Sequence, residues 1–404
     1  MEEIVVNVLF LSVTGLYDLS KREIYEDLMR QFVRNGHKVY IVSPVERRTN
    51  RKTEMYESGG AQVLCVRTLN IQKTNIIEKG IGVLLLGSQY SQAINRFWKD
   101  IRFGLVLYVT PPITLNQVIR HIRQRDKART YLLLKDIFPQ NAVDLGLFSR
   151  RSLLYHLFRH TERELYRLSD YIGCMSPANV EFLLRHNPDV DANKVHVNPN
   201  SIEVMERSAV DKNAVHKKYG LPSDRPIFIY GGNLGHPQGI DFLLQMIEHY
   251  EHDDSLFFVV AGSGTEYPKV ESWFAAHRPQ NARLQPYLPK AEYDSLVQSC
   301  DAGMIFLDRR FSIPNFPSRL LSYMEYRMPV IIASDPNTDI GRIAEENGFG
   351  VWSESGDAKH FIANVKKLMD PQIRKDMGDR GYRYLLDNYT ADKSYSIIVN
   401  ALKQ

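Results

Sequence analysis

The sequence predicts an α/β protein of two doubly wound domains with a cleft between them, and three observations support this. First, the chain has 404 residues, more than a single hydrophobic core usually serves. Second, short apolar runs alternate with amphipathic stretches, which indicates parallel strands joined by helices. Third, two such series are separated by the polar and charged segment 203–225, which is typical of a linker.

The first series begins with a β-α-β unit. Residues 5–12 are almost continuously apolar, as expected for a parallel strand that is covered on both faces. The helical pattern that follows places Leu28 and Phe32 on one face and ends at Asn35-Gly36. We expect further strands at residues 37–42, 62–66, 105–109, 130–134, 171–175 and 195–198, and a long helix at 153–168.

The second series repeats this pattern. We expect its strands at residues 226–230, 256–261, 302–307 and 329–334, and a helix at 239–250. The domains are therefore predicted at residues 1–202 and 203–380, with a C-terminal helix at 381–404 that packs back on the first domain. Ligands of open α/β sheets bind at the carboxyl ends of the strands, so the cleft between the domains is the expected active site.

Composition restricts the class of protein. Apolar residues make up 44% of the chain and charged residues 24%, which is typical of a globular protein. The three cysteines are far apart and show neither metal-ligand spacing nor a disulfide framework, which fits a reducing compartment. The acidic first residues lack the basic region of a signal peptide, and no apolar run reaches about 18 residues. We therefore expect a cytoplasmic location.

Charge is distributed unevenly along the chain, whose formal net charge is +4. Residues 1–202 carry 28 Lys and Arg against 20 Asp and Glu, so the remainder is negatively charged. A basic first half could face anionic lipid, a diphosphate or nucleic acid, or it could be ordinary scatter on a solvated surface. A nucleic-acid module is not expected, because the basic residues are not interleaved with a stacking platform.

Two Gly-rich turns in the second series give the first indication of a binding site. Glycines between a strand and a helix let the backbone approach a phosphate, and the helix N-terminus supplies amide donors. Either turn alone could serve tight packing only, but two in corresponding places favour a phosphate site. The first turn holds Gly231, Gly232, Asn233 and Gln238, and the second holds Gly262, Gly264 and Glu266.

A third motif, Pro317-Ser318-Arg319, supplies a cation. Pro and Ser suit the first positions of a helix, whereas the helix dipole disfavours an arginine there. An arginine in the first turn is explained if an anion binds at that helix end and the guanidinium contacts it. A surface salt bridge is the alternative.

These motifs, in this order, resemble the sugar-nucleotide half of family 4 glycosyltransferases, which have the GT-B fold of two Rossmann-like domains. The N-terminal half agrees, because Asn35-Gly36-His37 resembles the family's first helix-to-strand turn. Thr110-Pro111-Pro112 and Asp136-Ile137-Phe138-Pro139 resemble the bacterial branch that builds capsule and O-antigen repeat units, including its N-acetylfucosaminyl transferases. The resemblance spans nearly the whole chain.

The resemblance implies transfer of a sugar from a nucleoside-diphosphate sugar, with retention of anomeric configuration and no required metal or cofactor. The diphosphate would lie between residues 231–233 and the helix opened by Ser318-Arg319, and the base near residues 262–266 and Tyr287. The acceptor would enter past Gly15 and Asp136. A UDP-N-acetyl aminosugar donor, and a polyprenyl-diphosphate-linked saccharide acceptor at the inner face of the plasma membrane, rest on the resemblance alone.

The sequence departs from the family at two acidic positions. The family has two glutamates eight positions apart near the last motif, and the matching places here are Pro314 and Ser322. Glu325 lies three residues beyond Ser322, on the same helix face. It could take over ribose binding or be solvated.

Two residues of the first domain are candidates on the acceptor side. Asp136 follows a strand end beside the expected cleft, so it could orient an acceptor hydroxyl or act as a general base. Its alternative is a turn or N-cap aspartate. Lys135 could contact an acceptor phosphate, or it could be an exposed charge.

The segment 70–98 is a candidate for contact with an anionic membrane surface. Its apolar residues Ile76, Ile77, Ile81, Leu84 and Leu85 are accompanied by the basic residues Lys73, Lys79, Arg96 and Lys99. A helix and loop that face the core of the first domain are the alternative.

Two other functions stay open at this point. One is a sugar-nucleotide epimerase on the same fold. The other is a non-catalytic sugar-nucleotide-binding subunit of a polysaccharide assembly complex, which the missing glutamates favour.

Overall fold

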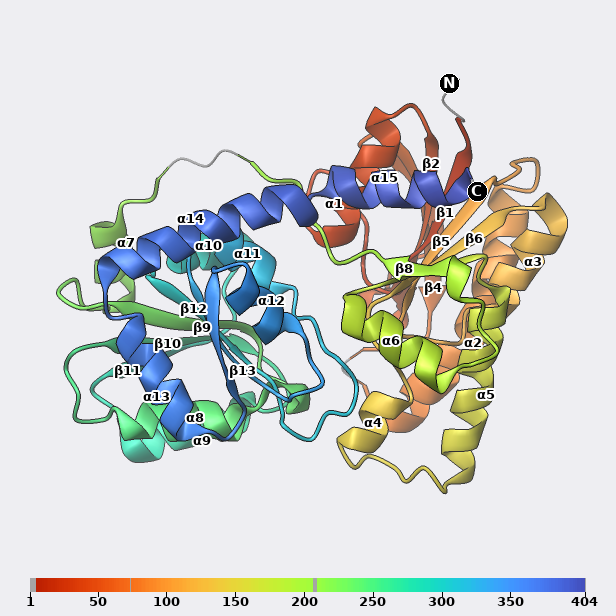
Figure 1. Cartoon of the computed structure of the whole chain (residues 1–404). Helices are drawn as coiled ribbons and strands as arrows, with labels where there is room; N and C mark the ends of the chain where they lie inside the picture. The colour runs from red at the N-terminus through yellow and green to blue at the C-terminus, as the bar shows by residue number, and fades with distance from the viewer. Residues whose placement is uncertain (1–4, 73, 206–208, 404) are drawn as a thin grey trace. The chain divides into compact units, whose positions relative to one another are not determined.

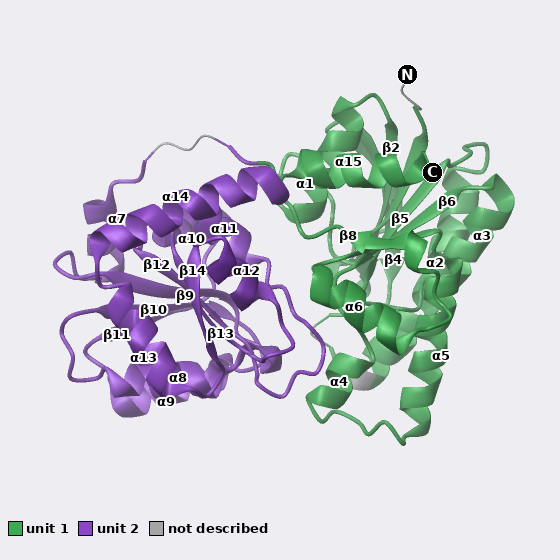
Figure 2. Cartoon of the chain, viewed as in Figure 1, with its two compact units in different colours: residues 1–203, 389–404 green, residues 204–388 purple. Residues whose placement is uncertain are grey.

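A computed structural model describes residues 5–72, 74–205 and 209–403 of the chain. The chain divides into two compact units (Figure 2). Unit 1 comprises residues 1–203 and 389–404, and unit 2 comprises residues 204–388. Among the described residues, no helix is both long and apolar enough to cross a membrane.

Unit 1 is built on an eight-stranded sheet with the order β3-β4-β2-β1-β5-β6-β7-β8 (Figure 1). All neighbours pair in parallel except β3 and β4, which form an antiparallel hairpin. The central strands are buried over almost their whole length, as parallel strands covered on both faces are. The strands are β1 (Asn7–Leu11), β2 (Lys38–Glu46), β3 (Glu54–Ser58), β4 (Ala61–Thr68), β5 (Leu105–Thr110), β6 (Arg129–Leu134), β7 (Tyr171–Cys174) and β8 (Val195–Val197).

Helices connect these strands, and several begin at a side-chain cap. Asn75, Ser152 and Ser176 each accept a hydrogen bond from a backbone amide in the first turn of α2, α5 and α6. The helices of unit 1 are α1 (Ile24–Arg34), α2 (Ile76–Phe97), α3 (Asn116–Asp126), α4 (Gln140–Asp144), α5 (Leu153–Leu168), α6 (Pro177–His186) and α15 (Ala391–Leu402), with short 3-10 turns η1 (Arg47–Thr49) and η2 (Ala192–Lys194).

Unit 2 has a six-stranded, fully parallel sheet with the order β11-β10-β9-β12-β13-β14. Its strands are β9 (Ile227–Asn233), β10 (Phe257–Ser263), β11 (Ala282–Gln285), β12 (Ala302–Phe306), β13 (Val330–Ser334) and β14 (Gly350–Glu354). Its helices are α7 (Lys212–Tyr219), α8 (Ile240–His249), α9 (Tyr267–His277), α10 (Lys290–Ser299), α11 (Arg319–Glu325), α12 (Ile340–Glu346), α13 (Ala358–Lys367) and α14 (Pro371–Asn388), with the 3-10 turn η3 (His236–Gln238).

The predicted fold class is confirmed: each unit is a parallel, doubly wound sheet with helices between its strands. The structure adds elements within the segments predicted as loop or linker. Helix α7 lies within the predicted linker 203–225, where Asp211 caps its first turn and Gly220 ends it in the left-handed region. Its sequence is polar on nearly every face, so its hydrophobic pattern gave no signal. Helix α14 continues to Asn388 within unit 2, and α15 begins only at Ala391.

Helix α15 belongs to unit 1 and packs on α1. The backbone of Ile202 pairs with that of residues 389–391 on either side of a short bridge. Ser394 donates a hydrogen bond of 2.7 Å to the Asn198 side chain. The buried His37 ring lies 3.0 Å from the Tyr395 hydroxyl, at the turn from α1 to β2.

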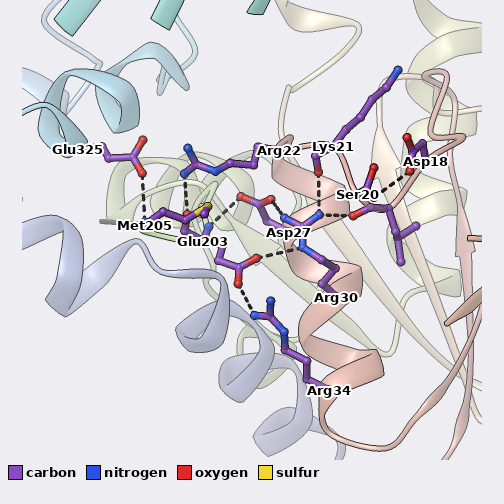
Figure 3. A network of polar contacts seen from close by, with 11 residues as sticks. Asp18, Ser20, Lys21, Arg22, Asp27, Arg30, Arg34, Glu203, Met205 and Glu325 are labelled. Atoms are coloured by element: carbon purple, nitrogen blue, oxygen red, sulfur yellow. Dashed lines mark hydrogen bonds and ion pairs between the residues drawn. The ribbon is translucent and has the colours of Figure 1, made fainter. Parts of the chain in front are cut away.

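A network of arginines and carboxylates fixes Glu203, the last residue of the first segment of unit 1 (Figure 3). The Glu203 carboxylate receives hydrogen bonds from Arg30, at 3.0 Å, and from Arg34. The Glu203 backbone amide donates to Asp27 at 2.8 Å, and its carbonyl accepts from Arg22 at 2.6 Å. The backbone of the chain is therefore anchored to α1 at the point where it leaves unit 1.

Strands β9 and β10 approach unusually closely at their carboxyl ends. A Cβ atom on Gly262 would lie 1.8 Å from the carbonyl oxygen of Gly232, and φ of Gly262 is +153°. Only glycine fits this position without displacing the neighbouring backbone. The two strand ends therefore depend on the absence of a side chain here.

Gly262→Ala is expected to destabilise unit 2 by about 2 kcal/mol or more, because it combines a backbone clash with an unfavourable φ. Urea unfolding measures this change. Gly80→Ala is the matched control, since a Cβ at Gly80 of α2 meets nothing within 4 Å and alanine favours a helix. Equal stability of the two variants would contradict the close approach of β9 and β10.

Candidate functional site

The candidate site lies at the carboxyl ends of β9 and β10, where the two Gly-rich turns meet. The register pairs Gly231–Asn233 of β9 with Ala261–Ser263 of β10. The Leu234 amide then donates to the Ser263 carbonyl at 2.9 Å, and the Leu234 carbonyl accepts from the Glu266 amide at 2.8 Å. The two turns are thus one connected backbone structure, as the paired motifs predict.

Glu266, predicted on the donor side, contacts two neighbouring side chains, His236 and Lys269. Its carboxylate lies 2.6 Å from the His236 ring nitrogen and 3.7 Å from the Lys269 ammonium. Lys269 also pairs with Asp241 on α8. Glu266 therefore joins the two turns at the side-chain level as well.

Arg319 is the cation of this site. Its guanidinium carbon lies 4.2 Å from the centre of the Tyr230 ring, and its Nη2 donates to the Gln238 side chain at 2.6 Å and to the Asn233 carbonyl at 3.2 Å. A Cβ on Gly232 would lie 3.9 Å from the guanidinium carbon. The structure thus brings Arg319 together with three residues predicted from the first turn.

The second terminal nitrogen of Arg319, Nη1, differs from Nη2 in its hydrogen bonding. Nη1 is buried and has no hydrogen-bond partner among the described residues. No carboxylate among these residues pairs with Arg319. A buried cationic donor without a partner is costly in free energy unless an acceptor is supplied. This arrangement suits an anionic ligand that lies against residues 232–233.

Two tyrosines that were not predicted as site residues shape the site: Tyr323 is buried and Tyr293 is half-buried. The Tyr323 hydroxyl accepts from the Gly231 amide at 3.1 Å and donates to the Ile229 carbonyl at 3.2 Å. A Cβ on Gly231 would lie 2.1 Å from the Tyr293 hydroxyl oxygen. Tyr323 follows Arg319 by four residues, which is about one helical turn. This spacing could have indicated from the sequence that Tyr323 lies on the same face of the helix as Arg319.

The loop before α11 is held by the end of β13. The Asn315 amide donates to Thr338 Oγ1 at 3.0 Å, and this hydroxyl donates to Asp335 at 2.8 Å. Asn337 donates from its side chain to the Phe311 carbonyl at 2.9 Å. Burial raises the pKa of the Asp335 carboxyl. These bonds fix the approach to Pro317 and hence the start of α11.

The remaining predicted donor residues are less closely grouped. Pro317 is half-buried and Ser318 is exposed, at the start of α11. Tyr287 is 72% exposed and lies on the loop after β11, the strand next to β10. Gly264 follows β10 in the second turn.

Glu325 lies at the far end of α11 from Arg319, roughly 9 Å along the helix axis at 1.5 Å per residue. Its carboxylate accepts a long hydrogen bond of 3.5 Å from the Met205 amide (Figure 3). The structure therefore gives Glu325 a contact with the start of unit 2. It does not bring this carboxylate into the Arg319 group.

On unit 1, the acceptor-side candidates follow the carboxyl ends of β1 and β6. Gly15 is exposed, after a turn whose Thr14 carbonyl accepts from the Ser12 and Ser43 hydroxyls at 2.6 and 3.0 Å. Strand β5 separates β1 from β6, so the two loops start roughly 10 Å apart at normal strand spacing. Both lie at the edge where ligands of such sheets bind.

Asp136 and Lys135 both have perturbed pKa values. Burial raises the pKa of the Asp136 carboxyl to about 6. Its Oδ2 accepts from the Asn141 side chain at 2.7 Å, while its Oδ1 is buried without a partner among the described residues. Burial lowers the pKa of the Lys135 ammonium to about 7, and Nζ donates to the Asn198 carbonyl at 3.2 Å. Such groups suit proton transfer or orientation of a substrate.

Residues that could hold a metal are not grouped in this way. Within the described ranges, no three His, Cys, Asp or Glu side chains gather in a manner that could hold a metal ion. The three cysteines are buried and free. Charged side chains at the two candidate sites include Arg319 in unit 2 and Asp136 and Lys135 in unit 1.

Comparison with known proteins finds a family match within unit 2. Residues 211–384 match the family described as Glycosyl transferases group 1. The chain is 23% identical over 291 residues to the probable glycosyltransferase WbjE of Pseudomonas aeruginosa, covering 72% of this chain and 71% of WbjE. It is 22% identical over 298 residues to the putative colanic acid biosynthesis glycosyl transferase WcaI of Escherichia coli, with 72% and 71% covered.

Solved structures show the same fold across the whole chain. HepE of Anabaena in complex with UDP has a TM-score of 0.69 at 12% identity, covering 98% of this chain and 99% of HepE. An Escherichia coli structure described as trehalose-6-phosphate bound with UDP-2-fluoro glucose has a TM-score of 0.72 at 9% identity, with 98% and 99% covered. The chain therefore has the fold of GT-B glycosyltransferase structures, and residues 211–384 of unit 2 are similar to the glycosyl transferases group 1.

Proposed function

We propose that this chain transfers a sugar from a UDP-sugar to a saccharide acceptor, and that unit 2 binds the donor. One observation carries the proposal: the cationic Nη1 of Arg319 is buried without a partner beside Gly232 and Asn233. A diphosphate supplies the missing acceptor oxygens, and arginine is the side chain best suited to it. UDP is favoured because UDP or a UDP-sugar is bound in both similar structures.

The Gly-rich turns give the donor site its second feature. Gly232 has no side chain, and a Cβ there would lie 3.9 Å from the Arg319 guanidinium carbon, so the backbone of β9 can approach a phosphate beside this guanidinium. We assign the diphosphate to this place, Gln238 and Asn233 to its rim, and the base to residues 262–266 with Tyr287. An N-acetyl aminosugar as the transferred group rests on the family resemblance.

On the acceptor side we propose a polyprenyl-diphosphate-linked saccharide, as in the assembly of capsule or O-antigen units. The name of WcaI, which places that relative in colanic acid biosynthesis, supports a polysaccharide product. Lys135 supplies a cation for an acceptor phosphate, and the Gly15 loop lies at the same edge of the sheet. Asp136 is assigned to the acceptor hydroxyl.

The proposed reaction uses these residues as follows. The acceptor oxygen forms a bond to the anomeric carbon of the sugar while the bond from that carbon to the β-phosphate oxygen breaks. UDP leaves with the bonding electrons, and Arg319 stabilises the negative charge that develops on its phosphate. Asp136 orients the acceptor hydroxyl and receives its proton. Retention of configuration is part of the proposal through the family resemblance.

A second candidate function is a non-catalytic sugar-nucleotide-binding subunit. It is favoured by Pro314 and Ser322, which stand where the family has two glutamates. Binding of UDP-sugar without transfer to any lipid-linked saccharide would support this candidate. A changed sugar in the absence of an acceptor would instead indicate an epimerase.

Arg319→Ala is expected to raise the Kd for UDP at least about tenfold, since a hydrogen bond to a charged group contributes about 1.5–3 kcal/mol. Isothermal titration calorimetry measures the affinity. Arg342→Ala is the control, because Arg342 is an exposed arginine of α12 that pairs with Glu346. Unchanged UDP affinity in a folded Arg319→Ala protein would exclude the proposal that the diphosphate binds at this site.

Asp136→Asn is expected to lower the rate of transfer at least about 100-fold, within the usual range for loss of a general base, and to leave UDP affinity unchanged. Asp189→Asn, which alters an exposed carboxylate of unit 1, is the control.

The raised pKa of Asp136 also has a consequence for stability. Ionisation of Asp136 penalises the folded state as the pH rises from about 4 to about 6, so the Asn variant should gain Tm relative to the native chain over this interval. Full transfer activity of the Asp136→Asn variant would show that Asp136 has only a structural role in its turn.

The transfer rate is expected to depend on pH with two limbs. It should rise as Asp136 ionises near pH 6 and fall as Lys135 loses its proton near pH 7. Lys135→Arg should move the second limb to much higher pH, because arginine stays charged. A kcat/KM profile that is the same for both proteins would exclude Lys135 from acceptor binding.

A further inference from the structure

Large aliphatic side chains of unit 1 are exposed on two helices, α2 and α5, and on the loop before α5. On α2 they recur at helical spacing, on a face opposite to the buried Leu86, Tyr90 and Ile94. We call the whole set the apolar rim: Ile77, Ile81, Leu84, Leu85, Leu147, Leu153, Leu154 and Leu157. Ile77 is 72% and Leu153 is 86% exposed. A helix that covers a sheet usually turns such residues inward, so the rim indicates a binding surface.

Helix α3 lies between the two parts of the rim. It packs against α2 on one side and α5 on the other. Near the start of α3, Thr114 donates to the Val83 carbonyl of α2 at 2.8 Å, and Asn116 donates to the Thr161 carbonyl of α5 at 3.0 Å. The first turns of α2 and of α5 therefore extend beyond the start of α3, as Figure 1 shows for α5.

These projecting ends lie at the functional edge of the unit 1 sheet. Helices α2 and α3 follow the carboxyl ends of β4 and β5, and α5 runs back toward the start of β7. All three helices thus begin at the carboxyl edge of the sheet. The loops of Gly15 and Asp136 leave the sheet at the same edge.

The charges around the rim are basic and uncompensated. Lys79, Arg150 and Arg151 are exposed and have no carboxylate partner within the described ranges. The nearby carboxylates, by contrast, are neutralised or capped by partners: Glu78 by Arg47 at 2.8 Å, Glu162 by Arg159 at 2.5 Å, Glu164 by Arg120, and Asp144 by the Gln140 side chain at 2.6 Å. Residues 145–161 contain no acidic residue.

We propose that the apolar rim, with Lys79, Arg150 and Arg151, docks on an anionic lipid bilayer. Two projecting helix ends with aliphatic tips suit a planar acyl boundary, and unpaired cations beside them suit anionic headgroups. Lys73 and the side chain of Ile76 lie outside the described part of the chain. The inference rests on the proposed function for its purpose, which is to hold the acceptor edge of unit 1 against the membrane that carries a polyprenyl-linked acceptor.

The test uses the full chain and co-sedimentation with vesicles of phosphatidylcholine alone or mixed with phosphatidylglycerol. The first variant is Ile81→Ser/Leu84→Ser/Leu153→Ser/Leu157→Ser, and the second is Arg150→Glu/Arg151→Glu. Two controls on unit 2 match them: Leu386→Ser, at another exposed leucine, and Lys366→Glu/Lys367→Glu, at exposed lysines of α13.

The native chain is expected to bind the anionic vesicles and to bind the neutral ones at least about tenfold more weakly. Each rim variant should lose at least about tenfold in binding to anionic vesicles, from lost apolar burial or reversed charge, while both controls bind as the native chain does. Tm and UDP affinity, measured on the same preparations, should be unchanged in all variants.

Three outcomes would overturn the docking proposal: no binding of the native chain to anionic vesicles, native binding by the rim variants, or a lipid-free dimer of the native chain that the serine variant abolishes. The last would assign the rim to a second copy of the chain. Failure of the proposed function has a different signature, because a chain that binds vesicles as expected but neither binds UDP nor transfers a sugar retains the docking surface and loses the donor site.

Discussion

A partly buried guanidinium that lacks a counter-ion among the described residues is the constraint on which the proposed donor site of unit 2 depends. Arg319 obtains two acceptors, from Asn233 and Gln238, and the face of the Tyr230 ring. These neutral partners hold the side chain in place but do not neutralise it. Nη1 is left without an acceptor among the described residues, and the diphosphate that we propose would supply one beside Gly232.

The geometry around Arg319 is enforced from several directions. The close approach of Gly262 to Gly232 fixes the ends of β9 and β10, and Tyr323 ties the Gly231 amide to the helix that begins with Arg319. The Asp335–Thr338 contact holds the loop before that helix. Because each restraint is made by protein groups alone, the site is organised before a ligand arrives, which lowers the entropic cost of binding.

Sequence alone predicted the fold class and the central strands, because those signals are local: buried parallel strands read as apolar runs, and the glycine turns and Arg319 stand in short motifs. The β3–β4 hairpin and α7 were not predicted, since β3 is largely exposed and α7 is polar on most faces. Tyr293 and the Asp335–Thr338 contact were not predicted, because they belong to segments that are distant in the sequence from the site motifs. The sequence indicated that the apolar side chains of α2 could be exposed. That they belong with those of α5 follows only from the structure, in which both helices pack on α3.

A crystal structure of the chain with bound UDP tests the central claim most directly, because it locates the diphosphate relative to a single atom. The account predicts a phosphate oxygen within about 2.7–3.2 Å of Arg319 Nη1, with the diphosphate against the backbone of residues 231–233. A diphosphate bound elsewhere on the chain, with Nη1 still unpartnered, would contradict it.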